Sequence, residues 1–208
     1  VITLVQTKKA KPVPIVLFGS DYWKQLIDFD FLAEEGVISP NDVKLIEYVD
    51  APFKNVIAEI PQRYHDIWTA AKGFYKTEPA VADGGETILY APHITTVSEA
   101  HPEIYEIGYH CRDYYVKQWD KFKDVPWGVL AHSTHARGAG SYDPETGVES
   151  CRLKLTFATQ IPPEVCASIN VGYRDPATIP ALMEDPEFHV VTDAGEVLFR
   201  LASERPKS

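Results

Sequence analysis

The sequence predicts an α/β protein with a mostly parallel sheet flanked by helices. Residues 14–19 form a short, continuous apolar run that ends in Gly19, which is typical of a strand buried on both faces. Apolar residues then recur at helical spacing until Gly36, and residues 45–49 form a second apolar run. An order of strand, helix and strand favours the α/β class, either as one sheet or as two small α/β units joined near Pro61.

The elements before Pro61 follow from local signals. Asp21 can cap the first helix, and Gly36 can end it. Ser39-Pro40-Asn41-Asp42 predicts a turn with a helix cap before the strand at residues 45–49. We expect a second helix over residues 53–60, ended by Pro61.

The pattern continues to alternate after Pro61. Helices are expected over residues 62–75, over 99–121 in pieces broken at Pro102 and Gly108, and over 163–167 and 176–183. Strands are expected over residues 87–91, 125–130, 153–159 and 168–173, and in closing segments at 190–191 and 197–201. Residues 80–85 predict a turn, and residues 138–147 predict an irregular surface loop, because both segments are rich in turn-forming residues.

Composition excludes several classes of protein. The chain has 208 residues, and 20 basic against 30 acidic residues give 20 − 30 = −10, which disfavours binding to nucleic acid. No run approaches the roughly 18 apolar residues that a membrane span requires, so we expect a cytoplasmic protein without a membrane partner. The three cysteines, Cys111, Cys151 and Cys166, form no C-x-x-C pair, so we expect reduced thiols and no metal ligands. Because the chain starts on an apolar run without Met, we expect a fragment or a trimmed chain.

The densest polar segment is His132-Ser-Thr-His135-Ala-Arg137-Gly138. We expect it to form a loop after a strand, the usual place of ligands in α/β sheets, although the two histidines converge only if that loop turns sharply. Arg137 would clamp a small carboxylate or hydroxy acid, and His132 or His135 would move a proton. The alternative is a capped turn with surface histidines.

A second segment offers a cation beside an aromatic ring. Trp68 and Lys72 share a helix face at i, i+4, with Thr69 beside them, and His93 ends a strand that could face the same cleft. We therefore predict Lys72, with the two histidines above, as catalytic residues, and Trp68, Thr69, His93 and Arg137 as substrate-binding residues. The alternative is an ordinary helix with a core tryptophan and a solvated lysine.

From Trp68 onward the chain resembles the C-terminal domain of the LarA-type nickel-dependent lactate racemase family. The likeness rests on residues 68–73 (WTAAKG), 83–93, 132–138 and 170–176. The family's helix motif has a Gln where this chain has Thr69, so the resemblance implies a 2-hydroxy acid other than lactate. Either Trp119 or Trp127 would take the place of the family's substrate-side tryptophan.

The resemblance also implies isomerase chemistry with a nickel-pincer nucleotide. The family holds that cofactor through an N-terminal domain that has no counterpart here, so we expect this chain alone to hold none. The expected partners are a small 2-hydroxy acid carboxylate and, to complete the site, a partner domain or a second copy of the chain.

Residues 1–60 resemble the C-terminal part of the LOG-type nucleotide phosphoribohydrolases, often labelled possible lysine decarboxylases. The likeness lies in residues 3–9, 14–23, 32–40 and 48–50, while the family's Pro-Gly-Gly-x-Gly-Thr-x-x-Glu motif is absent. We therefore predict an incomplete LOG-like segment over residues 1–60 and a racemase-like C-terminal domain over 61–208. The predicted function is that of a substrate-contacting domain of a 2-hydroxy acid racemase or epimerase, inactive alone; the alternatives are a relative of the phosphoribohydrolases and a noncatalytic interaction module.

Overall fold

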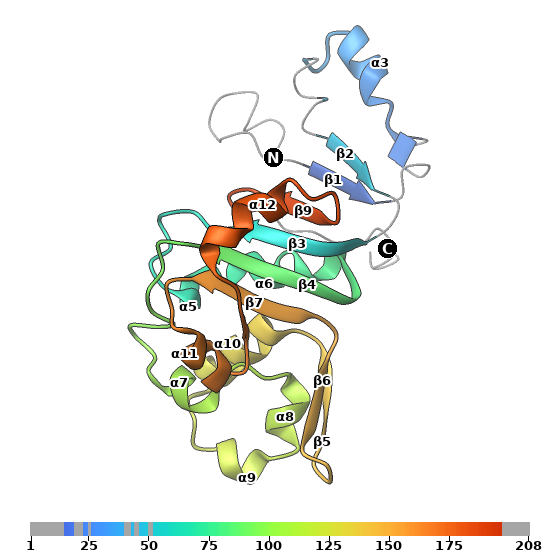
Figure 1. Cartoon of the computed structure of the whole chain (residues 1–208). Coiled ribbons are helices and arrows are strands. Elements are labelled where there is room, and N and C mark those ends of the chain that lie inside the picture. The colour runs from blue at the N-terminus through green and yellow to red at the C-terminus, as the bar shows by residue number, and fades with distance from the viewer. Residues whose placement is uncertain are drawn as a thin grey trace. The chain divides into compact units, whose positions relative to one another are not determined.

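A computed structural model describes residues 15–18, 23–24, 26–39, 43, 46–49 and 52–196. The chain divides into two compact units, residues 1–52 together with 199–208, and residues 53–198 (Figure 1). Each unit is described by itself. In the described part, no helix has the length and apolar character that crossing a membrane requires.

In the first unit, strands β1 (Ile15–Phe18) and β2 (Ile46–Val49) pair in parallel, which confirms both predicted strands. The helix between them is interrupted: α3 (Phe29–Glu34) has its own cap, because the Asp28 carboxylate accepts a hydrogen bond from the Phe31 N–H at 3.0 Å. Gly36 follows with a φ of 70°, the left-handed conformation that ends many helices. The predicted cap Asp21 and most of the turn at 39–42 lie outside the described residues.

The second unit is built on a parallel sheet of five strands, which confirms the predicted fold class. Its spatial order is β8 (Gly172–Tyr173), β7 (Lys154–Thr159), β4 (Val81–Ala91), β3 (Phe53–Glu59) and β9 (Phe188–Val191). All four neighbouring pairs are parallel, so the carboxyl ends of the strands meet at one edge.

The prediction of a helix at residues 53–60 was wrong, because this segment is the central strand β3. Val56, Ile57 and Ala58 are fully covered between β4 and β9. A short apolar run buried on both faces has no periodicity that separates strand from helix. The boundary between the two compact units lies directly before β3. The domain boundary near Pro61, which rests on the two family resemblances, stays a prediction.

Strand β4 also corrects the turn predicted at residues 80–85. The strand begins at Val81, directly after the short 3-10 helix Glu78–Ala80. Gly84 has a φ of 77°, and the register with β3 shifts between Phe53 and Asn55. The glycines thus mark an irregularity inside a strand rather than its beginning.

The two faces of the sheet carry different helices. Helices α5 (Ile67–Ala70) and α6 (Lys72–Tyr75) cover one face, where a Cβ on Gly73 would stand 2.6 Å from Ile60 Cδ1 and 3.2 Å from Leu89 Cδ2. Helix α12 (Ile179–Met183) covers the other face and packs Ile179 against Ile57 and Ile88 (Figure 1). The predicted helix 62–75 is thus two short helices, and residues 62–66 precede them outside any helix.

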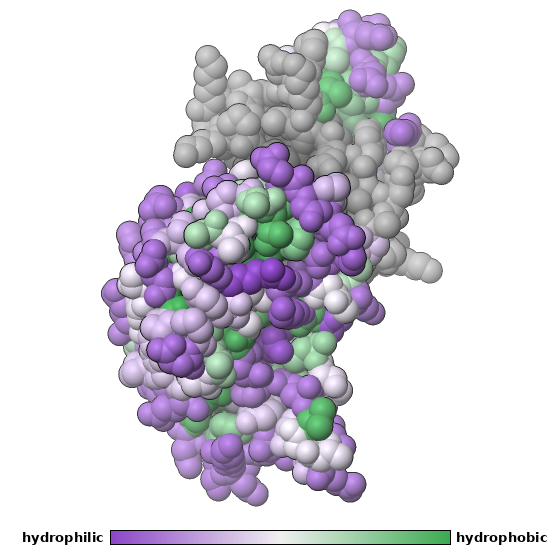
Figure 2. All heavy atoms as spheres, viewed as in Figure 1, coloured by the Kyte–Doolittle hydropathy of each residue, from purple (hydrophilic) through white to green (hydrophobic). Residues whose placement is uncertain are grey.

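The surface agrees with this layering. The face of the second unit seen in Figure 2 is mostly hydrophilic, and hydrophobic residues show over α12 and β9. The partly buried side chains of these two elements that pack against the core are Leu182, Met183, Phe188 and Val190.

The segment between β4 and β7 carries most of the remaining helices. Helices α7 (Glu103–Ile107), α8 (Arg112–Val116) and α9 (Trp119–Phe122) confirm the predicted pieces, with a break at Gly108, whose φ is 65°. After β7, the predicted helices are confirmed as α11 (Pro163–Ser168), the 3-10 turn Pro176–Thr178 and α12. The strand predicted over 168–173 is reduced to the two residues of β8.

Helix α10 (Trp127–Arg137) overturns the strand and loop predicted around His132. Its buried residues Val129, Leu130, Ser133 and Ala136 recur at i, i+1, i+4 and i+7, which is one face of a helix. The apolar start of this run resembled a strand only because the polar Ser133 belongs to the buried face.

The irregular loop predicted at residues 138–147 is instead mostly a hairpin. Strands β5 (Gly140–Asp143) and β6 (Val148–Cys151) pair antiparallel. The Asp143 carboxylate accepts from the Glu145 N–H at 2.9 Å and from the Thr146 hydroxyl at 2.8 Å, which closes the turn.

Candidate functional site

The candidate site lies where the chain leaves the carboxyl ends of β3 and β4. Helix α5 follows β3 and begins against the segment after β4: the Ile67 N–H donates to the Thr96 carbonyl at 3.2 Å, and the Trp68 N–H donates to the Val97 carbonyl at 2.9 Å. The carboxyl edge of a parallel sheet is where α/β proteins usually bind ligands. The site is therefore supported by rigid strands and presented by short helices.

Asp66 fixes the first turn of α5. Its Oδ1 accepts hydrogen bonds from the Thr69 N–H at 3.0 Å and from the Thr69 hydroxyl at 2.7 Å. The Thr69 side chain, predicted to bind substrate, is therefore engaged with the cap of its own helix. The Thr69 hydroxyl oxygen keeps its lone pairs, so it can still accept a hydrogen bond from a ligand.

Trp68 is the centre of a ring cluster that helix α10 completes. Its indole stacks with His132, with ring centroids 3.8 Å apart, and meets the His101 ring at a tilt of 31°, with centroids 4.0 Å apart. Tyr109 Oη lies 3.2 Å from His132 Nε2. We call these four residues, Trp68, His101, His132 and Tyr109, the indole–imidazole cluster.

Two members of this cluster, His101 and Tyr109, were missed from the sequence. Both His93 and His101 lie in the segment that follows the central strand β4, and His101 directly precedes Pro102. Position after a central parallel strand was the available signal. Tyr109 carries no such signal, because only the packing of α10 places its hydroxyl against an imidazole.

Burial keeps His132 and Tyr109 uncharged. Burial lowers the pKa of His132 to about 4; Asp66 opposes this shift, and the neighbouring His101 and His135 reinforce it. Burial also raises the pKa of Tyr109 well above its ordinary value. At neutral pH, Tyr109 is therefore the donor and a neutral His132 accepts at Nε2, which assigns the ring proton to Nδ1.

The helix, rather than a sharply turned loop, brings His132 and His135 to one side of α10. Residues at i, i+3 are neighbours on a helix surface, and His135 contributes to the pKa shift of His132. His135 is exposed and meets the Tyr75 ring edge-on, with centroids 5.5 Å apart. It is the more accessible of the two imidazoles.

Arg137 does not join the histidines. At i+5 from His132 it points to a different side of α10, and its charge acts to lower the pKa of Cys151. Its Nε is buried without a hydrogen-bond partner among the described residues. Arg137 therefore belongs to the surroundings of Cys151.

Lys72 and His93 both contact Tyr64. The Lys72 ammonium lies 5.2 Å from the centroid of the Tyr64 ring, and His93 Nε2 lies 2.9 Å from the Tyr64 carbonyl oxygen. The Tyr64 hydroxyl donates to Glu196 at 2.6 Å, which holds the ring in place. The predicted residues thus fall into three local groups, and their action as one site stays a prediction.

The cysteines are not arranged as nucleophiles. Burial raises the pKa of Cys111, and it raises the pKa values of Cys151 and Cys166 to about 12 and about 11. A nucleophilic cysteine needs its thiolate form, so these thiols are unreactive at neutral pH.

Trp119 and Trp127 are 45% and 75% exposed. Which of them would take the place of the racemase family's substrate-side tryptophan stays open.

Comparisons with known proteins match the two parts of the chain differently. A family described as possible lysine decarboxylase matches residues 1–60. A crystal structure of a protein from Thermotoga maritima is 37% identical with a TM-score of 0.68, over 74% of this chain and 38% of that chain. The lactate racemase apoprotein from Thermoanaerobacterium thermosaccharolyticum is 16% identical with a TM-score of 0.47, over 72% of this chain and 36% of that chain. No curated protein matches.

The family match confirms the resemblance stated for residues 1–60. The family match covers the segment predicted as LOG-like, and a lactate racemase is among the similar structures. Because the racemase is only 16% identical, no residue role is transferred from it. The chain spans 38% and 36% of the lengths of the two solved structures, so their complete activities do not carry over.

Proposed function

We propose that residues 53–198 bind a small 2-hydroxy acid carboxylate at the carboxyl ends of β3 and β4. In this proposal the unit is the substrate-contacting C-terminal domain of a LarA-like racemase or epimerase. The observation that supports it most is the stack of Trp68 on a neutral His132, with Lys72 four residues after Trp68, at the start of α6. An apolar wall, a neutral hydrogen-bonding ring and one cation suit a small hydroxy acid.

The proposed roles follow from charge and exposure. Lys72 supplies the positive charge for the carboxylate, since Arg137 points to another side of α10. His132 can donate from Nδ1 to the substrate hydroxyl, while the exposed His135 is the candidate for proton transfer. His93 supports Lys72 through Tyr64 rather than by direct contact with the ligand.

The nickel-pincer nucleotide does not fit the residues of this cluster. His132 Nε2 faces the Tyr109 hydroxyl, and the ring is stacked against Trp68, so its lone pair is already engaged. An imidazole binds nickel through a free nitrogen lone pair, which His132 does not offer in this arrangement. We therefore propose that this chain alone does not hold the cofactor, and that a partner domain or second copy supplies the residues that do.

Binding can be measured by thermal unfolding with D-lactate, L-lactate, glycolate and 2-hydroxybutyrate. A ligand at about 100 times its dissociation constant should stabilise the protein by about 2.7 kcal/mol. Lys72→Met should remove the shift. Lys121→Met is the matched control, because the Lys121 ammonium also lies over an aromatic ring, Phe122, on the distant helix α9. If no hydroxy acid shifts the midpoint, the proposal is wrong.

Turnover separates a complete enzyme from a substrate-binding domain. Chiral chromatography of D-lactate, L-lactate and one enantiomer of 2-hydroxybutyrate after incubation with the chain should show no racemisation. Racemisation by the purified chain would contradict the proposed incomplete site.

A second candidate is a nucleotide-handling protein of the phosphoribohydrolase type, which the family match at residues 1–60 favours. Release of free base from a nucleoside monophosphate would establish it in place of the first proposal. A noncatalytic interaction module would show neither base release nor stabilisation by a hydroxy acid.

A further inference from the structure

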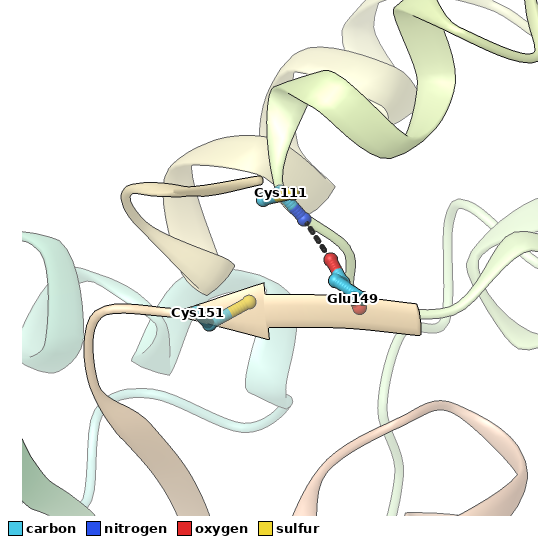
Figure 3. A group of neighbouring side chains, drawn as sticks. All are labelled: Cys111, Glu149 and Cys151. Atoms are coloured by element: carbon cyan, nitrogen blue, oxygen red, sulfur yellow. Dashed lines mark hydrogen bonds between the residues drawn. The ribbon is translucent and has the colours of Figure 1, made fainter. Parts of the chain in front are cut away.

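A second polar group lies apart from the indole–imidazole cluster. Cys111 Sγ, Cys151 Sγ and a carboxylate oxygen of Glu149 lie within 4.8 Å of one another (Figure 3). Cys111 is buried, and the other two side chains are partly buried. We call these three residues the thiol–carboxylate cluster.

The hairpin and α8 build this cluster. Glu149 and Cys151 are two residues apart on β6, so their side chains share one face of the strand. Cys111 immediately precedes α8, which is joined to β5 because the Tyr142 N–H donates to Asp113 at 3.2 Å and Lys117 donates to the Tyr142 carbonyl at 2.7 Å. These contacts fix the distance between the thiol on one segment and the two ligand groups on the other.

Gly140 makes the close approach possible. It pairs with Cys151 across the hairpin, and a Cβ at this position would stand 2.9 Å from Cys111 Cβ and 3.1 Å from Cys151 Cα. Any larger residue would push the two cysteines apart.

Hydrogen bonds orient the carboxylate before any ligand binds. Glu149 accepts from the Cys111 N–H at 2.6 Å, from His110 Nδ1 at 2.8 Å and from Asn170 Nδ2 at 2.8 Å. A carboxylate has about four lone-pair sites, so these three donors leave roughly one for a further partner. Such outer hydrogen bonds are the usual way in which proteins aim a metal-binding carboxylate.

The donor types select the class of ligand. Two thiolates and one carboxylate favour zinc or a similar thiophilic ion over calcium or magnesium, which prefer oxygen. Two zinc-bound sulfurs at about 2.3 Å from the metal would stand roughly 3.8 Å apart, so closure by no more than about 1 Å is needed. Arg137, whose buried Nε lacks a partner among the described residues and whose charge acts on Cys151, would balance the negative charge left after a dication binds.

We propose that Cys111, Cys151 and Glu149 bind one thiophilic divalent cation such as zinc, with the fourth coordination position taken by water. Binding displaces the protons of both thiols, which burial keeps protonated in the metal-free protein. The site ties the β5–β6 hairpin to the start of α8, and it stands independently of the proposed hydroxy acid site.

The test is a titration of the full, reduced, chelator-treated chain with Co²⁺ as the probe, followed by Zn²⁺. We expect thiolate-to-cobalt charge-transfer absorption that saturates at one equivalent and disappears when zinc displaces cobalt. Cys151→Ser should abolish the absorption. Cys166→Ser is the matched control, because Cys166 is a buried free thiol on α11 outside the cluster, and it should titrate like the unaltered protein.

A second measurement does not depend on any variant folding. X-ray absorption of the zinc-loaded, unaltered chain should show two sulfur and two lighter ligands. Absence of the cobalt absorption, its survival in a folded Cys151→Ser variant, or a zinc shell without sulfur would each overturn the proposal.

Discussion

Helix α10 lies beside two buried polar groups whose charge states differ. In the indole–imidazole cluster, His132 has one hydroxyl partner, and burial drives its pKa down to about 4, so it stays neutral. In the thiol–carboxylate cluster, burial acts to raise the pKa of Glu149, but hydrogen bonds from His110 and the Cys111 N–H bring it down to about 2, so it stays charged. A buried charge survives where its hydrogen-bond partners favour the charged form. N–H donors favour the Glu149 carboxylate, whereas the Tyr109 hydroxyl, which donates to His132, does not favour an imidazolium.

The largest effect that tests this contrast is expected from removing the charged carboxylate. Glu149→Ala leaves the His110, Asn170 and Cys111 donors without their shared acceptor, so it should cost about 3–5 kcal/mol of unfolding free energy in the metal-free chain. Urea unfolding measures the loss. Glu145→Ala, on the exposed turn of the same hairpin, should stay within about 0.5 kcal/mol of the unaltered protein. Equal effects of the two changes would show that Glu149 is not an organising residue.

The next effect is acid sensitivity, which the two clusters should show in different pH ranges. The folded-state pKa of His132 lies below the unfolded value of 6.5, so the unfolded chain binds the proton first and stability falls between about pH 6.5 and pH 4. The loss should be on the order of 2–3 kcal/mol. Glu149, lowered from 4.5 to about 2, should add its loss only below about pH 4.5.

Urea unfolding at a series of pH values, with a chelator present, measures both ranges. His132→Gln should remove the loss above pH 4.5, whereas the exposed His65→Gln should leave it in place. A His132→Gln curve that still falls between pH 6.5 and 4.5 would mean that another group carries this dependence.

A smaller effect should follow from crowding the thiol–carboxylate cluster. Gly140→Ala places a methyl group 2.8 Å from the Ser150 carbonyl oxygen and 2.9 Å from Cys111 Cβ, so it should cost about 1–3 kcal/mol and weaken cobalt binding. Gly128→Ala in α10 meets no atom within 4 Å and should be neutral or slightly stabilising. Thermal unfolding compares the two, and an unperturbed Gly140→Ala protein would show that the hairpin is not closely packed.

The smallest effect concerns the ring stack. A double-mutant cycle with Trp68→Leu and His132→Leu should give a coupling energy of about 0.5–1.5 kcal/mol, the value of an aromatic contact beyond its buried area. Trp68→Leu with Tyr75→Leu is the comparison pair and should be nearly additive. A coupling near zero for Trp68 and His132 would mean that they are neighbours without a specific interaction.

Sequence signals predicted helices and strands correctly where a few neighbouring residues determine the structure. The short helices α7, α8 and α9 were predicted from Pro102 and Gly108, the strands β1 and β2 from compact apolar runs, and β7 from alternation with β-branched and aromatic residues. These signals failed to distinguish strand from helix where a segment is buried and its pattern of apolar residues shows no clear period. Val56-Ile57-Ala58 has no periodicity, and the buried Ser133 hid the helical face of α10.

The sequence by itself determined the α/β class, the approximate positions of most elements and the presence of Trp68, Lys72, His132 and His135 as candidate polar residues. Only the tertiary structure decided which of them meet. Helix α10 places His132 against Trp68, and the charge of Arg137 on the same helix acts on Cys151. The β5–β6 hairpin places Glu149 and Cys151 beside Cys111, which lies far from them in the sequence. The physical reason is that secondary structure depends on neighbours within a few residues, whereas a site depends on contacts that form only when distant segments exclude water together.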